Sequence, residues 1–160
     1  MNIFVFGTLL SETFRKIVLG RELHSEHICT ASLKNFCVYW AECGPFPVIV
    51  PQNGAEVQGI VLKDLNEHDI ERLNYYELGF GYVLEEALVE TNDCLQNVFA
   101  YFCKSSDMAS KNLWSFDDWL TKHSEIQYLA TTEFMDFFGT KFGDTAVSYT
   151  HLTLPTRCLG

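Results

Sequence analysis

"NIFVFGTLLSETFRKIVLG", the stretch from Asn2 to Gly20, contains the signals that set the fold of this chain. Its opening run, NIFVF, is short, apolar and continuous, and it stops at Gly7-Thr8, which predicts a buried strand that enters a tight loop. Ser11 is a favourable helix N-cap, and Gly20 suits the end of the helix that follows. The chain is therefore expected to begin with a strand, a glycine loop and a helix.

The next segment is rich in strand-forming residues. "HICTASL" and "FCVYWA" predict two strands joined by a turn at Leu33-Lys34-Asn35. "PVIVPQNGAEVQGIVL" predicts two more strands, because Asn53-Gly54 is a strong hairpin signal. We therefore expect a run of short antiparallel strands here.

Helices and strands alternate after this segment. Asn66 with Asp69 matches a capping box at the start of a short helix, which is expected to fray around Tyr76. "YVLEEALVET" and "NVFAYFC" predict two strands, and Ser115 with Asp118 predicts the start of another helix. "EIQYLATTEFMDFFG" predicts a last helix. Its expected buried stripe is Ile126, Leu129, Ala130, Phe134 and Phe137.

The order of these elements indicates the fold class. Helices segregated from a strand-rich core indicate an α+β fold with a small curled sheet or barrel. The chain has 160 residues, which is the size of one domain. Chains near this size bury roughly 68–70% of their unfolded surface, so the core needs no disulfide or metal to stabilise it.

Composition and charge narrow the function classes. The net charge of −10 argues against nucleic acid and against anionic membrane surfaces, because both bind Lys and Arg. No apolar run reaches the ~20 residues of a membrane span, and the N-terminus lacks the basic region of a signal peptide.

The six cysteines form no Cys-x-x-Cys pair and predict reduced thiols, so we expect a cytoplasmic protein. His24-x-x-His27 has no further ligand at metal spacing, and no metal is expected.

The C-terminal end differs from the rest of the chain. "VSYTHLTLPT" resembles the translation of a transposase sequencing adapter. We therefore expect the domain to span residues 1–146 and residues 147–160 to be a non-native tail. The alternative is a natural, disordered C-terminus.

Two stretches are candidates for chemistry. A strand that ends at Gly7-Thr8 leaves backbone N–H groups that can hold an anion or a carbonyl oxygen, although a plain turn explains the same residues. "LNYYELGFGY", from Leu73 to Tyr82, places Glu77 among aromatic residues at a helix end. Burial and the negative end of the helix dipole would both raise the pKa of this carboxyl, as a general base near neutral pH requires. A solvated Glu is the alternative, and these residues alone do not choose between the two.

Taken together, these motifs resemble the γ-glutamylcyclotransferase-like (AIG2-like) family. Phe6-Gly7-Thr8-Leu9 takes the place of the family's Tyr-Gly-Ser/Thr-Leu loop. Pro45-Phe46-Pro47-Val48 is similar to its next strand, and Gly59-Ile60-Val61 to the following one. Leu73 to Glu77, with Tyr82 a few residues on, is similar to its "L-D-x-Y-E" helix. The resemblance covers about Ile3 to Cys103.

The resemblance implies a fold, an activity and a site. The fold is a small mixed β-barrel with flanking helices. The activity is ring closure of a γ-glutamyl amine or amino acid to 5-oxoproline with release of the amine, and it needs no cofactor. Glu77 takes the role of general acid and base. Phe6, Gly7, Thr8, Leu9 and Tyr82 take the role of substrate-binding residues.

A second reading stays open. Phe6 stands where the family has Tyr, and Asn74 where it has Asp. "LWSFDDWL" and the stretches above also resemble the N-terminal half of bacterial proteins that join this domain to a Nudix ADP-ribose hydrolase. The alternative is therefore a non-catalytic small-molecule-binding or accessory domain of a protein fused to a C-terminal Nudix domain.

Overall fold

The computed structural model of the chain describes residues 1–92, 94–104 and 106–140. The expected tail at 147–160 lies outside these residues. The strands are β1 (Ile3–Val5), β2 (Ile28–Ala41), β3 (Pro47–Leu62), β4 (Tyr82–Thr91), β5 (Cys94–Cys103) and β6 (Ala109–Leu113). The α-helices are α1 (Glu12–Leu19), α2 (Glu67–Leu78), α3 (Phe116–Lys122) and α4 (Ser124–Met135). Short 3-10 helices are η1 (Thr8–Leu10), η2 (Ser25–His27) and η3 (Ser106–Met108).

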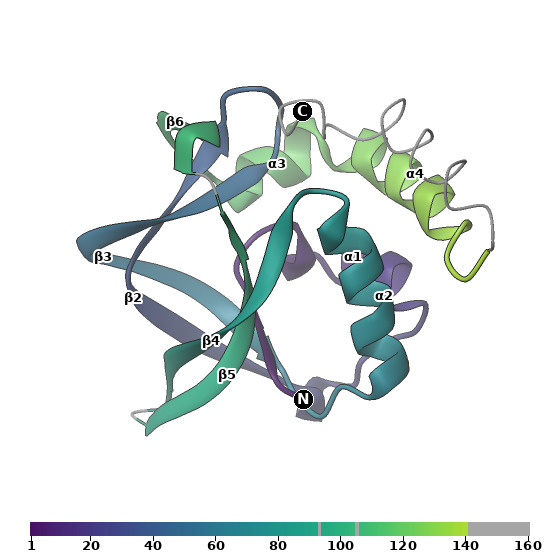
Figure 1. Ribbon diagram of the computed structural model, residues 1–160, viewed down its shortest axis with the longest axis horizontal. Coiled ribbons are helices and arrows are strands. Elements are labelled where there is room, and N and C mark those ends of the chain that lie inside the picture. The colour runs from purple at the N-terminus through teal and green to yellow at the C-terminus, as the bar shows by residue number, and fades with distance from the viewer. Residues whose placement is uncertain (93, 105, 141–160) are drawn as a thin grey trace.

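The strands form one mixed sheet that curls into a ring. Its order is β3-β1-β5-β4-β2-β6, and an additional pairing between β3 and β2 closes the ring. β1 pairs antiparallel with β3 and parallel with β5. Figure 1 shows the strands on one side of the molecule and α1 and α2 on the other. The expected α+β class with a small curled mixed sheet and flanking helices is confirmed.

The short strand β1 is buried on both of its faces. Phe4 packs with residues of the sheet such as Val61 and Val98, inside the ring. Ile3 and Val5 point the other way and join the core beneath the helices, which contains Phe14 and Trp119 among others. A strand with two buried faces has no polar position, so its sequence is a continuous apolar run. This strand leads directly into the Gly7 loop.

The predicted helix caps are present. The N–H of Phe14 donates to Ser11 Oγ at 3.2 Å, and α1 ends at Gly20. Asn66 and Asp69 form the reciprocal capping box of α2, which continues through Glu77 to Leu78 instead of fraying at Tyr76.

The two predicted turns in the strand region are wrong. Asn35 lies inside β2, and Asn53-Gly54 lies inside β3. The register between these strands shifts there, from Lys34 opposite Glu56 to Phe36 opposite Pro51. The N–H of Gly54 donates to Asn35 Oδ1 at 3.1 Å. The two turn signals therefore face each other across one bulge, where paired strands bend without ending.

The helix α4 is present, but its predicted buried stripe is wrong in part. Phe134 is buried, whereas Ile126 and Leu129 are 74% and 70% exposed. Thr131 is buried instead, where α4 packs against α1. The tertiary packing of α4, including its contact with α1, determines which face of the helix is buried.

Two further findings concern the cysteines and the length of the helices. Cys29, Cys37, Cys94 and Cys103 are not in disulfides, as expected for reduced thiols. Within the described residues, no helix is long and apolar enough to cross a membrane.

Candidate active site

One pocket brings together the two stretches that the sequence singles out. The described residues that line it include all six predicted site residues: Phe6, Gly7, Thr8, Leu9, Glu77 and Tyr82. The empty space is about 580 Å³ when the open mouth is included. β1 and η1 supply one wall of the pocket, and the end of α2 with the start of β4 supplies another.

The loop after β1 presents backbone donors to this pocket. The N–H groups of Leu10 and Ser11 donate to Gly7 O at 2.9 Å and Thr8 O at 3.1 Å. The Arg15 guanidinium donates to the carbonyls of Leu9 and Leu10, at 3.0 and 2.9 Å, so these two acceptors are occupied. The N–H groups of Gly7, Thr8 and Leu9 have no acceptor among the residues that the structure describes. Such unpaired N–H groups at a helix start suit an anion or a carbonyl oxygen.

The close approach of two chain segments explains the glycine in this loop. A Cβ atom on Gly7 would lie 2.7 Å from Pro47 Cγ, far inside van der Waals contact. Pro47 begins β3 and also lines the pocket. The loop can therefore lie this close to β3 only without a side chain at position 7.

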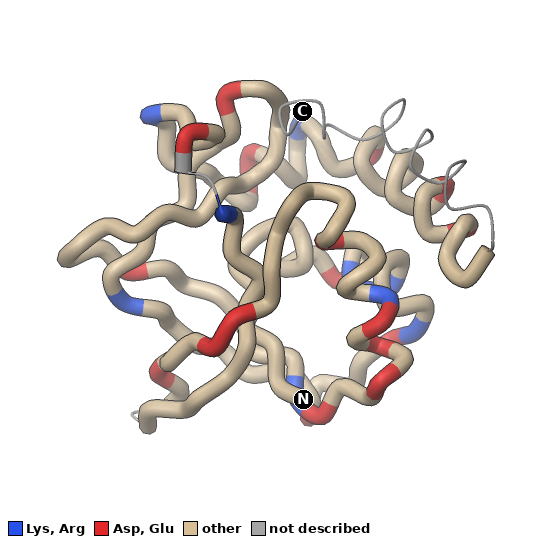
Figure 2. Tube along the Cα trace, in the orientation of Figure 1, with Lys and Arg blue, Asp and Glu red and all other residues tan. Residues whose placement is uncertain are grey.

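Figure 2 shows several acidic positions along α2, and two of these side chains are buried. Burial raises the pKa of the Asp69 carboxyl, but hydrogen bonds from Arg21 and from the Asn66 backbone outweigh burial and leave that pKa below its ordinary value. Glu77 differs because no Lys or Arg is among the described residues that line its pocket. Its side chain is held among aromatic rings, and burial raises its pKa from 4.5 to about 8.

Aromatic residues form the rest of the wall around Glu77. The Phe80 ring lies 5.1 Å from that of Tyr76 and 6.1 Å from that of Tyr82. The Tyr82 hydroxyl donates to Pro47 O at 3.0 Å, which ties β4 to β3 over the pocket. Burial raises the pKa of the Tyr76 and Tyr82 hydroxyls well above their ordinary value, and the negative charge of Glu77 is a second, smaller cause in the same direction. These hydroxyls therefore stay protonated.

The pocket also contains residues that were not predicted as site residues. Tyr101 of β5 donates its hydroxyl to Asn74 Oδ1 at 2.6 Å, and Gln127 of α4 donates Nε2 to Pro45 O at 2.8 Å. Both side chains line the pocket. The alternation of β5 could have indicated Tyr101, since a residue on the helix side of this strand faces α2. No sequence signal points to Gln127, which only the packing of α4 brings to the pocket.

This pocket combines one group that can exchange a proton with a ligand and a set of backbone N–H groups that can donate hydrogen bonds to it. Among the lining residues that the structure describes, Glu77 is the one acid. No group of three or more His, Cys, Asp or Glu within the described residues could hold a metal ion. A ligand with an anionic or carbonyl oxygen could contact the loop amides while a basic nitrogen contacts Glu77.

Comparisons with known proteins place these features in a family context. The sequence model described as "Gamma-glutamyl cyclotransferase, AIG2-like" matches residues 3–121. AIG2-like protein B of Arabidopsis thaliana is 28% identical over 138 residues, which is 84% of this chain and 78% of that protein. A solution structure of an A. thaliana protein has a TM-score of 0.58 at 24% identity and covers 87% of this chain and 93% of its own. A solved gamma-glutamyl cyclotransferase has a TM-score of 0.55 at 17% identity, covering 93% of this chain and 85% of that one, which shows a shared fold.

Proposed function

This chain belongs to the AIG2-like γ-glutamyl cyclotransferase family, and from that membership we propose that it is a cyclotransferase. It converts a γ-glutamyl amine or amino acid to 5-oxoproline and releases the amine. Glu77 is the general acid and base, and the Gly7-Thr8-Leu9 loop binds the substrate. The observation that carries the proposal is that the Glu77 carboxyl and the unpaired amides of this loop line one pocket.

The pKa of Glu77 suits the first step of this reaction. The α-amine of the substrate is protonated near neutral pH, and an α-amino group has an ordinary pKa of about 7.7–8.0. The pKa of Glu77 is about 8, so the transfer of a proton from this ammonium to the carboxylate is nearly balanced in energy. The neutral amine can then attack the γ-carbonyl carbon of the same molecule.

The same carboxyl group completes the reaction. The new C–N bond closes a five-membered ring, and the bond from the γ-carbon to the leaving nitrogen breaks. Glu77, protonated in the first step, gives its proton to this nitrogen as the bond breaks. The carboxylate then takes the second proton from the ring nitrogen and passes it to the released amine, so the products are 5-oxoproline and the amine as its ammonium ion, and the carboxylate is restored. No redox change occurs and no water is consumed, so the reaction needs no cofactor.

The loop amides have a separate role in binding. The α-carboxylate of a γ-glutamyl compound is an anion that the N–H groups of Gly7, Thr8 and Leu9 can hold. Phe6 and Tyr82 enclose the ligand, and exclusion of water strengthens its contacts with these amides.

A product assay tests the proposal. The chain is incubated with γ-glutamyl amines and γ-glutamyl amino acids, and 5-oxoproline, glutamate and the free amine are quantified. We expect 5-oxoproline and amine in equal amounts. Glutamate in place of 5-oxoproline would show hydrolysis, and the absence of both products would refute catalysis.

The activity is expected to rise with pH up to about 8. Burial raises the pKa of Glu77 to about 8, so the carboxylate that accepts the proton is a minor form at pH 6 and gains about tenfold per pH unit up to this pKa. The measurement is kcat/KM from pH 5 to 9. A rising limb centred near the ordinary Glu pKa of about 4.3 would contradict the role of a buried base.

Gly7→Ala is expected to lower kcat/KM by about 10²-fold, since small misplacements of binding groups have effects of this size. The added Cβ would lie 2.7 Å from Pro47 Cγ, and the proline ring cannot swing away as a flexible chain end can. The loop and its N–H groups must therefore move. Steady-state kinetics and thermal unfolding of the variant measure the effect. An unchanged kcat/KM in the folded variant would show that the amides do not bind substrate.

A second candidate is a binding domain of the same fold without turnover. Two observations favour it: Phe6 lacks the hydroxyl of the family's loop Tyr, and Asn74 lacks the charge of the family's Asp. Asn74 nevertheless accepts the Tyr101 hydroxyl, a contact that an Asp could also make. This candidate predicts thermal stabilisation by a γ-glutamyl compound without formation of 5-oxoproline.

A further inference from the structure

Gln127 is a polar residue of the pocket with no role in the steps above. It lies on α4 (Ser124–Met135), outside residues 3–121 that match the family. Its side chain reaches the pocket beside the turn between β2 and β3. Phe46 of this turn and Pro47, the first residue of β3, also line the pocket. This wall meets the Gly7-Thr8-Leu9 loop at Pro47, against which Gly7 lies.

The orientation of the Gln127 amide follows from its hydrogen bond. Nε2 lies 2.8 Å from Pro45 O, and a carbonyl oxygen can only accept, so the nitrogen must face Pro45 and the oxygen Oε1 must face away. No described residue donates to Oε1. Oε1 is also not among the described buried atoms that lack a partner, so it is accessible from the pocket or from solvent. The bond to Pro45 thus holds an available acceptor in place.

The other polar groups of the pocket already have partners or roles. The Tyr82 and Tyr101 hydroxyls donate to Pro47 O and Asn74 Oδ1. The Tyr76 hydroxyl and the Thr8 side chain are hydrogen-bonded to each other. The loop amides can only donate, and Glu77 exchanges a proton with the substrate. A γ-glutamyl amide has one further donor, the N–H group on the nitrogen that leaves. None of the groups above accepts a hydrogen bond from this N–H in the proposed steps.

We infer that Gln127 is a specificity-determining residue whose Oε1 accepts a hydrogen bond from the leaving-amine side of the substrate. This inference rests on the proposed cyclotransferase function. The amide N–H of the substrate donates to Oε1, while Nε2 keeps its bond to Pro45 O. Within residues 3–121, which match the family model, the Gly7-Thr8-Leu9 loop binds the glutamyl half, and Gln127 of α4 recognises the half that leaves.

The test compares two substrates that differ in this one donor. A γ-glutamyl alkylamide and its N-methyl derivative share the glutamyl half, but only the first has an N–H to donate. We expect wild-type kcat/KM to favour the N–H substrate by at least about tenfold, as for loss of one hydrogen bond. In Gln127→Leu this ratio should fall toward one. Inhibition by 5-oxoproline, which lacks the leaving amine, should stay unchanged.

Two controls separate recognition from structure. Glu125 is an exposed residue of the same helix, and Glu125→Gln should keep the wild-type ratio. Gln127→Met, close in size to Gln, repeats the test if the Leu variant does not fold. An equal loss with both substrates, together with weaker inhibition by 5-oxoproline, would show that Gln127 only supports the Pro45 turn. A wild-type ratio in both variants would overturn the inference.

The failure of the proposed function can be recognised separately. If the wild type forms no 5-oxoproline from any substrate, catalysis is refuted, and the same pair of compounds is compared by thermal stabilisation. Stronger stabilisation by the N–H compound that is lost in Gln127→Leu would support recognition by Gln127. Equal stabilisation of both proteins by both compounds would overturn it.

Discussion

Glu77→Gln is expected to lower kcat/KM for a γ-glutamyl substrate by about 10²- to 10⁴-fold, the contribution typical of general acid–base catalysis. Glutamine is close to Glu in shape and keeps the pocket intact, but it can neither accept the proton of the α-ammonium nor return one to the leaving amine. The measurement is the rate of 5-oxoproline release by wild type and variant at pH 8.

The same variant is expected to be more stable than the wild type at high pH. The Glu77 pKa is about 8 in the folded chain and near 4.5 when exposed, so the folded state binds more protons between these values. The stability of the wild type therefore falls as pH rises through this range, whereas the neutral amide that replaces this carboxyl in the variant cannot ionise. Glu77→Gln should raise the free energy of unfolding by on the order of 2–4 kcal/mol at pH 8 and by little near the exposed-state pKa.

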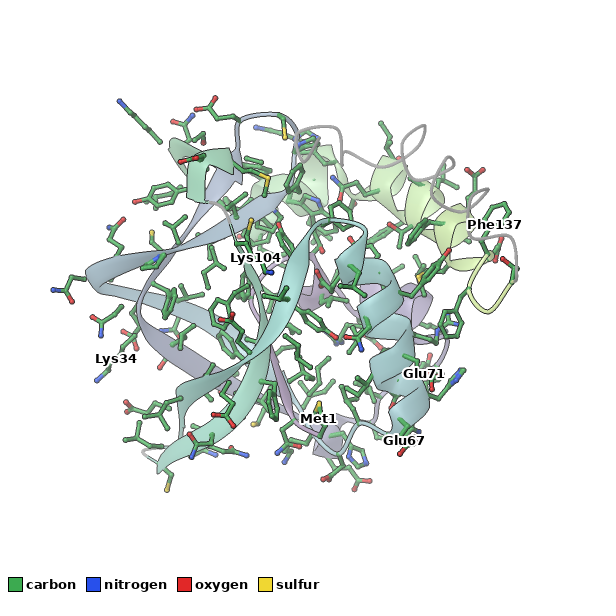
Figure 3. All side chains as sticks on the ribbon, in the orientation of Figure 1. Met1, Lys34, Glu67, Glu71, Lys104 and Phe137 are labelled. Atoms are coloured by element: carbon green, nitrogen blue, oxygen red, sulfur yellow. The ribbon has the colours of Figure 1, made fainter. Side chains whose placement is uncertain are left out.

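Glu71→Gln is the matched control, because Glu71 is an exposed residue of the same helix that points away from the body of the molecule (Figure 3). This variant should keep both the activity and the pH dependence of stability. A Glu77→Gln variant with full activity would contradict the role of Glu77, whatever its stability.

Gly59→Ala is expected to lower the free energy of unfolding by about 3 kcal/mol, at the upper end of the usual effect of overpacking. Gly59 lies in β3, where an added Cβ would overlap the carbonyl oxygen of Val5 and lie 2.7 Å from Phe4 Cζ. The first of these atoms belongs to the backbone, so the strand β1 itself must shift. β1 pairs with both β3 and β5, and a shift of β1 disturbs both pairings.

Urea denaturation of Gly59→Ala measures this effect, with Gln58→Ala at the neighbouring exposed position as the control. Because β1 leads directly into the Gly7 loop, the folded fraction of Gly59→Ala should also bind substrate more weakly. A loss below about 1 kcal/mol, similar to that of the control, would show that β1 can move away without cost.

The start of the fold and the main parts of the site could be predicted from local sequence. The run before Gly7 is apolar on both faces because β1 is buried on both faces, and the caps at Ser11 and Asn66 are formed by neighbouring residues. The aromatic residues around Glu77 distinguish it from the other acids of the chain, and several of them line the same pocket. Each of these features depends on residues that are close in sequence.

The features that were missed depend on contacts between distant segments. Asn35 and Asn53-Gly54 have the local preferences of turns, but they face each other in paired strands and form a bulge. The buried face of α4 is determined by its contact with α1, which leaves Ile126 and Leu129 exposed. Gln127 reaches the pocket only because α4 also lies near the Pro45 turn. The hydrophobic periodicity of one segment does not show which distant segment packs against it.

The most direct test of the central claim is a carbon-13 NMR titration of the side-chain carboxyl groups in wild type and Glu77→Gln. We expect one carboxyl resonance that is absent from the variant and titrates with a midpoint near 8, close to the pKa of a substrate α-amine. If every Glu carboxyl of the wild type titrates near its ordinary pKa of about 4.3, Glu77 is solvated and the claim that it is a buried base is wrong.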